Sequence, residues 1–176
     1  MDSNSSAWPR GPLVVGVLLV AACAGYGGSN LRPGVSTLPE VVASMGEPAM
    51  VWSNPDGSEQ LAYPRGPAGT QTFMVHVAPD GRLQRIEKVL NTAHFARVQA
   101  GMGRDEVLRI LGPSGARWTQ FYSLSNQLAW SWLFCNSWNS QEFFDVMFDA
   151  GSGIVRSTGR HPNLAGPDGT PPMCGQ

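Results

Sequence analysis

The titratable residues of this 176-residue chain do not form a pattern typical of a catalytic or metal-binding site. Its three histidines, His76, His94 and His161, are far apart and have no glutamate or cysteine at the spacing that zinc sites use. Asp105 and Glu106 are adjacent carboxylates, but both fall in the first turn of an expected helix, where negative charge complements the helix dipole. We therefore expect a protein that is not an enzyme and that uses no metal or other cofactor.

The residue expected to be modified is Cys23, which follows an apolar run over residues 13–22. This run is about half as long as a membrane-spanning helix of roughly 20 residues, and it is typical of the apolar region of a secretory signal peptide. Val20, Ala21 and Ala22 precede the cysteine and resemble a bacterial lipobox, in which the cysteine is acylated and becomes the mature N-terminus. The alternatives are an ordinary signal peptide and a buried strand in which this cysteine has no such role.

Acylation of Cys23 would make the mature protein a lipoprotein. Stable anchoring needs more than one fatty-acid chain, and a lipoprotein cysteine carries several, palmitate among them. Residue 24 is alanine rather than aspartate, which in enterobacterial-type sorting favours the outer membrane over the inner one. We thus expect a signal peptide over residues 1–22, a lipidated tether of small residues over 23–33, and a protein on the periplasmic face of the outer membrane.

The other two cysteines, Cys135 and Cys174, are an even pair in what would be an oxidising compartment. A disulfide between them would close a loop of about 40 residues and would stabilise the fold by roughly 3–4 kcal/mol in the chain-entropy model. The alternative is two unpaired thiols, one in a strand and one in a mobile tail.

Composition favours one ordinary domain or two very small ones, with little surface charge. The net charge is −1 and the isoelectric point is near 6.3, which argues against a nucleic-acid-binding protein because such proteins normally carry a basic patch. Charged residues are 14% of the chain, against about 25% in typical domains. With 21 glycines and 14 prolines, the chain is rich in turns.

The chain after the tether contains a repeat of two units, residues 34–91 and 92–160. Residues 40–46 and 106–112 share a pattern that starts with glutamate and valine and ends in glycine. Each unit is expected to begin with a short helix at this pattern and to continue with strands joined by hairpin turns. This order predicts an α+β fold in which each unit packs a short helix, or a helix pair, on a small antiparallel sheet.

Strands are expected where apolar residues alternate or run together between turn residues. The expected strands are residues 49–53, 71–77, 82–90, 117–122, 127–134, 142–148 and 154–158. Of these, 82–90 also has apolar residues at helical spacing, and we interpret it as a strand because its counterpart in the second unit also follows a glycine turn. Residues 161–176 are rich in glycine, proline and asparagine and are expected to be a disordered tail.

Residues 98–113 resemble the opening of the BamE family, also called SmpA/OmlA. The shared pattern is a Gly-Met turn at 101–102, a helix with an acidic residue before valine, then Leu-Gly and Pro113; the Trp-rich strand at 128–132 lies where that family has an aromatic strand. The resemblance implies an outer-membrane lipoprotein that assists the insertion of β-barrel proteins. The first unit then looks like a degenerate copy, and two units in tandem also resemble the β-lactamase inhibitor protein architecture.

Aromatic residues are concentrated in the second unit. Those on one face of residues 127–134 are expected to be core beneath the helix. Phe143 and Phe144 point to opposite faces, so both cannot be buried in a sheet that is covered on one side only. The hypothesis is that Trp138, Phe143 and Trp118 form an exposed patch that binds a protein partner, since aromatic residues often anchor interfaces.

These features predict a non-enzymatic scaffold or interaction module that is anchored in the outer membrane and acts in outer-membrane protein assembly or envelope integrity. Its partners would be the membrane, through the lipid anchor, and a protein of the outer-membrane assembly machinery. No nucleic acid and no small-molecule substrate is expected. The alternative is a periplasmic inhibitor-like binding protein of the tandem β-lactamase-inhibitor-protein architecture.

Substitution of Cys23 tests the lipobox. We expect Cys23→Ala to leave a precursor without an acyl chain, because the thiol is the group that is acylated. Metabolic labelling with a palmitate analogue measures this, and Cys174→Ser is the matched control because it removes a thiol outside the motif. Acyl labelling that persists in Cys23→Ala would refute the lipobox.

Overall fold

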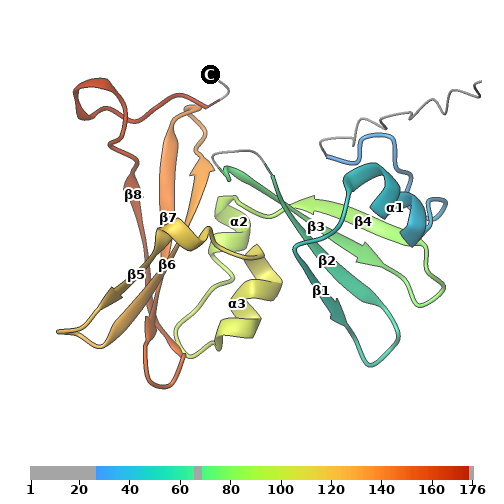
Figure 1. The fold of residues 1–176 in the computed structure, drawn as a ribbon, viewed down its shortest axis with the longest axis horizontal. Helices are drawn as coiled ribbons and strands as arrows, with labels where there is room; N and C mark the ends of the chain where they lie inside the picture. Colours follow the sequence, from blue (N-terminus) through green and yellow to red (C-terminus); the bar gives the residue numbers. More distant parts are fainter. Residues whose placement is uncertain (1–26, 66–68, 175–176) are drawn as a thin grey trace, which may run out of the picture.

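The computed structural model describes residues 27–65 and 69–174 (Figure 1). The expected signal peptide, Cys23 with its lipobox, and the start of the tether lie outside these described residues. The described chain is mostly β, with two four-stranded antiparallel sheets and a few short helices. Each sheet is built from consecutive strands, so every strand pairs with a neighbour in the sequence.

The first sheet is a meander of β1 (Met50–Ser53), β2 (Glu59–Arg65), β3 (Gln71–Val77) and β4 (Leu83–Lys88). The turns after β1 and β3 contain Gly57 and Gly81, whose φ angles of 82° and 78° lie in the left-handed region that glycine tolerates. Pro64 of β2 lies beyond Ala62, where the pairing with β1 stops. Its missing N–H therefore removes no hydrogen bond to that strand.

One face of the first sheet is covered by α1 (Leu38–Met45). The helix begins with a capping box, in which the backbone N–H of Thr37 donates to Glu40 Oε2 at 2.7 Å. Val41 and Met45 lie one turn apart on the buried face of this helix. Together with α1, the core of the first unit contains Leu61, Tyr63, Phe73, Val75, Val77 and Leu83.

The second sheet consists of β5 (Thr119–Tyr122), β6 (Gln127–Cys135), β7 (Gln141–Asp149) and β8 (Val155–Pro162). Between the two sheets the chain forms α2 (Thr92–Phe95), α3 (Arg104–Leu111) and the 3-10 helix η1 (Ala116–Trp118). A further 3-10 helix, η2 (Pro167–Gly169), follows β8.

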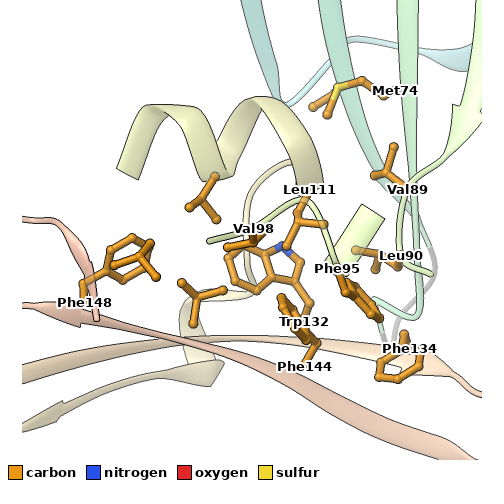
Figure 2. Close-up of a cluster of buried hydrophobic side chains, with 14 of the residues drawn as sticks. Met74, Val89, Leu90, Phe95, Val98, Leu111, Trp132, Phe134, Phe144 and Phe148 are labelled. Atoms are coloured by element: carbon orange, nitrogen blue, oxygen red, sulfur yellow. The ribbon is translucent and has the colours of Figure 1, made fainter. Parts of the chain in front are cut away.

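A single apolar core joins the two sheets across α3 (Figure 2). Val107 and Leu111 of α3 are completely buried in it. The first sheet contributes Trp52, Ala62 and Met74 from the face that α1 leaves uncovered. Further members from α2 and the second sheet are Phe95, Trp132, Phe134, Phe144, Val146, Phe148 and Val155.

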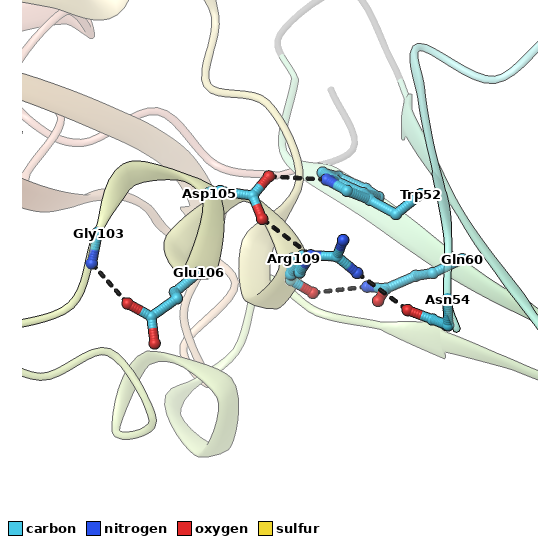
Figure 3. Close-up of polar contacts among 7 residues, drawn as sticks. All are labelled: Trp52, Asn54, Gln60, Gly103, Asp105, Glu106 and Arg109. Carbon is cyan, nitrogen blue, oxygen red and sulfur yellow. Dashed lines mark hydrogen bonds and ion pairs between the residues drawn. The ribbon is translucent and has the colours of Figure 1, made fainter. Parts of the chain in front are cut away.

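Hydrogen bonds between α3 and the first sheet fix the position of this helix (Figure 3). Trp52 Nε1 donates to Asp105 Oδ1 at 2.9 Å, and Gln60 Nε2 donates to the carbonyl of Arg109 at 2.6 Å. Arg109 donates in turn to Asp105 Oδ2 at 2.9 Å and to Asn54 Oδ1 at 3.1 Å. The Trp52 indole N–H and, after it, the Arg109 guanidinium lower the pKa of Asp105. Asp105 therefore bridges the two units in addition to lying in the first turn of α3.

Gly112 is a point of close approach between the backbone after α3 and the first sheet. Its φ is 73°, and a Cβ atom there would lie 2.7 Å from Thr72 Cγ2. Trp132 Nε1 donates to the Gly112 carbonyl at 3.1 Å, from the opposite sheet. Its counterpart in the repeat, Gly46, has a φ of 80° and nothing within 4 Å of such a Cβ. Both glycines end a helix, but packing excludes a side chain only at Gly112.

The predicted fold class, α+β with each short helix packed on its own small sheet, is wrong. The structure is mostly β, and its helices are short elements beside and between two four-stranded sheets. The physical reason is that the first sheet is apolar on both faces: Leu61 and Tyr63 of β2 pack in the core under α1, whereas Ala62 packs in the core with α3. No strand is predicted over residues 59–65, so the second apolar face of this sheet is missed.

The chain after β7 also differs from the predicted disordered tail over residues 161–176. In the structure β8 continues to Pro162, and the chain is described as far as residue 174. The Asn163 N–H donates to the Gln141 carbonyl at 3.1 Å, and the Gln141 N–H donates to the Pro172 carbonyl at 2.9 Å. The segment thus folds back along the start of β7. Residues 175–176 lie outside the described residues.

The shared core predicts that the two units unfold together. We expect Leu111→Ala to lower the free energy of unfolding by about 2–5 kcal/mol, because the substitution removes most of a completely buried side chain and leaves a cavity in its place. Urea titration with hydrogen exchange of β3 and β7 amides measures this, and both strands should lose protection in one transition. Leu124→Ala, at a fully exposed site, is the control and should change stability by no more than about 0.5 kcal/mol. Loss of protection in β7 alone would contradict a shared core.

Candidate functional site

Trp138, the central residue of the predicted partner-binding patch, lies in the turn between β6 and β7 with 83% of its surface exposed. Asn136 holds the backbone of this turn, because its Oδ1 accepts hydrogen bonds from the N–H groups of Trp138 at 2.9 Å and Ser140 at 3.0 Å. Asn139 has a φ of 58°, in the left-handed region where asparagine is enriched. The turn therefore has a defined shape although its aromatic side chain faces solvent.

The segment after β8 braces this turn from one side. Cys135, at the end of β6, forms a disulfide with Cys174, with 6.1 Å between the Cα atoms. Next to it, the Cys174 N–H donates to the Asn139 carbonyl at 2.8 Å, and Asn139 Nδ2 donates to the Cys174 carbonyl at 3.0 Å. We call residues 136–140 together with residues 172–174 the braced turn. The disulfide that the sequence left open is thus present, and it ties the tail to the turn that carries Trp138.

Other exposed apolar side chains lie on the segment that braces the turn. Met173 pairs with Ser140 through an isolated β-bridge and is 45% exposed, and Leu164 follows the last strand and is 62% exposed. Neither belongs to the two buried clusters of the described residues. An exposed tryptophan on a fixed backbone is suited to bind an apolar pocket of another protein, since little conformational entropy is lost when it docks.

The prediction that Phe143 is exposed is wrong. Phe143 is only 7% exposed, because Trp118 packs edge-on against it at 4.8 Å between ring centroids and His161 covers it at 5.2 Å. Phe144 is buried too, on the opposite face, so the second sheet is covered on both sides at this position. Trp118 and Phe143 therefore form a cluster with His161, and only Trp138 of the three proposed residues stands free in solvent.

The edge strand β5 carries a second exposed apolar group that was not predicted as a site. Phe121 is 53% exposed, Tyr122 is 48% exposed, and Leu124 in the following turn is fully exposed. β5 pairs with residues 127–130 at the start of β6, whereas the braced turn follows the end of β6, so the two groups lie at opposite ends of the sheet. All four residues of β5 are exposed, which the strand predicted over residues 117–122 does not show.

Glu142 links the braced turn to the sheet. Its Oε1 accepts a hydrogen bond from Asn136 Nδ2 at 2.6 Å, and its Oε2 accepts one from Arg160 Nε at 3.2 Å. The Asn136 amide lowers the pKa of this carboxyl, burial opposes the shift, and Arg160 adds to it. The carboxylate form is therefore the one that holds Asn136 in place.

Within the described residues, no group of three histidine, cysteine, aspartate or glutamate side chains is arranged to hold a metal ion. None of the described helices has the length and apolar character of a membrane span. What the arrangement offers chemically is a fixed apolar contact surface at the braced turn.

No protein-family model matches the sequence, and no curated protein matches it. Among solved structures, the chain is similar to the crystal structure of an extracellular protein containing an SCP domain from Bacillus anthracis str. Ames. The alignment covers 74% of this chain and 43% of that chain, at 13% sequence identity and a TM-score of 0.28. A likeness of this size carries no conclusion about fold or function, and the resemblance to the BamE family stays a prediction.

The pKa of Glu142 reports on the braced turn. We expect Asn136→Ala to raise this pKa toward the ordinary value of 4.5, because the largest stabilising hydrogen bond to the carboxylate is lost. Since the folded-state pKa is lowered, the contribution of Glu142 to stability is present above pH 4.5 and is lost as the pH falls through the folded value. NMR titration of the side-chain carboxyl carbons measures both values.

Asp149 is the internal control for this titration. Its pKa is about 2, because the backbone N–H and the hydroxyl of Ser152 and then the Arg156 guanidinium stabilise the carboxylate. Asn136→Ala should leave that value unchanged. A Glu142 pKa that does not move in this variant would show that Asn136 does not hold the carboxylate.

Proposed function

We propose that this protein is a lipid-anchored, non-enzymatic interaction module of the outer membrane, and that it holds a protein partner at the braced turn. The observation that carries the proposal is the exposure of Trp138 on a backbone fixed by a disulfide and side-chain hydrogen bonds. Tryptophan is enriched among residues that dominate binding energy, and a rigid turn reduces the entropic cost of docking.

The described start of the chain bears on the position of such an anchor. Gly28 is buried against the first unit, and Ser44 of α1 donates to Asn30 Oδ1 at 2.8 Å, so the expected tether packs on the fold from this point. Gly27 is the fourth residue after Cys23, and an extended chain spans at most about 3.6 Å per residue. An acylated Cys23 would therefore lie within roughly 14 Å of the first unit.

The braced turn belongs to the other unit, at the end of the second sheet. In Figure 1 the start of the described chain lies beside α1 and the first sheet, and the last described residues, drawn in red, lie near the top of β7. Because one core joins both sheets, the distance between the anchored side and Trp138 is set by the fold. An anchored molecule of this kind would present the indole away from its point of attachment.

The proposed partner is a protein of the outer-membrane assembly machinery that exposes an apolar pocket to the periplasm. The support for this choice is the resemblance of residues 98–113 to the BamE family together with the lipobox at Cys23. The aromatic anchor is consistent with such a partner, since interface cores are poor in charge and rich in aromatic residues.

Capture of the partner tests this function. We expect Trp138→Ala to reduce recovery of assembly-machinery subunits from detergent-solubilised envelope by about tenfold, the effect of losing roughly 1.4 kcal/mol or more at an anchor residue. The melting temperature should stay the same, because the side chain is exposed. Leu124→Ala, at the opposite end of the sheet, should capture the partner as the unaltered protein does.

Three results would count against the proposal. Equal capture by Trp138→Ala and the unaltered protein would remove the braced turn as the binding site. A large drop in the melting temperature of Trp138→Ala would mean that the residue is structural. Recovery of only a soluble periplasmic hydrolase would favour the inhibitor-like alternative.

A further inference from the structure

A polar hollow lies beside the shared core, where the first sheet meets α2 and α3. Its volume is about 180 Å³, enough for a small polyatomic ion with bound water. The lining comes from both units: β2, β3 and β4 on one side, and α2, α3 and the segment between them on the other. We call it the inter-unit pocket, and the charged or titratable residues that line it are His76, Arg85, Glu87, His94, Arg97 and Arg109.

Positive charge exceeds negative charge in this pocket. Three arginines face one carboxylate, Glu87, whose Oε2 lies 3.3 Å from Arg85 Nε. Arg109 is neutralised from outside the pocket by Asp105 at 2.9 Å. The Arg97 backbone N–H donates to the His94 carbonyl at 3.1 Å, but within the described residues its guanidinium forms no hydrogen bond or ion pair. The Arg97 guanidinium therefore has no anionic partner among these residues, and it lines a pocket in which positive charge already exceeds negative charge.

The excess of positive charge in the pocket affects the pKa values of its two histidines. Burial lowers the pKa of His76 and His94, and neighbouring guanidinium groups, Arg85 and Arg97 respectively, lower it further. Glu87 opposes both shifts without cancelling them. Burial, and after it the neighbouring guanidinium groups, thus favour the neutral form of both imidazoles.

The ring nitrogens of the two histidines differ in their partners. His94 Nδ1 lies 3.1 Å from Asn91 Oδ1, an acceptor, so Nδ1 carries the proton of the neutral ring and Nε2 becomes a donor when the imidazole is protonated. His76 Nε2 lies 3.1 Å from Glu87 Oε2, so the carboxylate is engaged by His76 as well as by Arg85. Arg97 and His94 are then the groups left for a ligand. Guanidinium and imidazolium N–H groups together are suited to the oxygens of a tetrahedral anion.

We propose that the inter-unit pocket binds a phosphate group, either free or as the headgroup of a small phosphate monoester. The bound oxygens would accept hydrogen bonds from Arg97 and from Nε2 of His94, which takes up a proton when the anion binds, with Arg85 as a third donor once it turns from Glu87. A cation is disfavoured by the three arginines. This site is separate from the braced turn, so its failure and the failure of the proposed function are distinguishable.

Titration with sodium phosphate at constant ionic strength tests the site. The ring signals of His76 and His94 are followed by NMR in the purified chain, and saturable shifts with a raised pKa of His94 are expected. Arg97→Gln should weaken binding about tenfold or more, the effect of losing a hydrogen bond between charged groups. Because Arg97 is exposed, the variant should keep its fold, which circular dichroism checks.

Two further variants separate a built site from general attraction. Glu87→Gln should tighten phosphate binding several-fold, because it removes the carboxylate that repels the ligand and frees Arg85. Arg32→Gln removes an exposed arginine that does not line the pocket and should leave the affinity unchanged. Equal weakening by Arg97→Gln and Arg32→Gln, or the absence of saturable histidine shifts, would overturn the proposal.

The source of the phosphate is resolved with two soluble probes. Dihexanoyl phosphatidic acid, used as monomers, carries a phosphate monoester, and dihexanoyl phosphatidylcholine is its control. Shifts that depend on Arg97 with the phosphatidic acid at lower concentration than with inorganic phosphate would assign the site to a lipid headgroup. Tighter binding of inorganic phosphate would assign it to the free ion.

Discussion

The arrangement of the molecule depends on the fact that one sheet has two apolar faces. Fully burying a large apolar side chain is worth about 1.5–3 kcal/mol, so leaving Trp52 and Met74 in water would cost a sizeable part of the roughly 5–15 kcal/mol that stabilises a domain. α1 covers the other face, and α3 covers this one. The bonds from Trp52 to Asp105 and from Gln60 to Arg109 then fix the helix at one position (Figure 3). The two units are consequently one body.

Local features of the fold could be predicted from the sequence. Which distant segments pack against each face of the two sheets could not. The Thr37–Glu40 capping box and the turn that exposes Trp138 depend on residues close in the chain, and both are present. β2 was missed because Pro64 and the small Ala62 hide its pattern. Phe143 was misjudged because Trp118, which covers it, comes from a different segment of the chain.

The two proposed binding features have different origins in this architecture. The braced turn is a local structure at the end of one sheet, held by the segment after β8. The inter-unit pocket exists only because the units are joined, since Gln60 and His76 come from the first sheet and His94 and Arg97 from the connection to the second. The helix that closes the core thus also forms one wall of the pocket. Neither feature requires a hinge between the units.

The position of Cys174 after all eight strands has a consequence for the order of assembly. Every strand of both sheets precedes this cysteine in the sequence, so the strands can pair before the disulfide forms. A polypeptide interrupted before residue 174 would contain all eight strands but lack the covalent support for its anchor residue. Only molecules that contain Cys174 and have formed its disulfide with Cys135 would then present Trp138 on a supported turn.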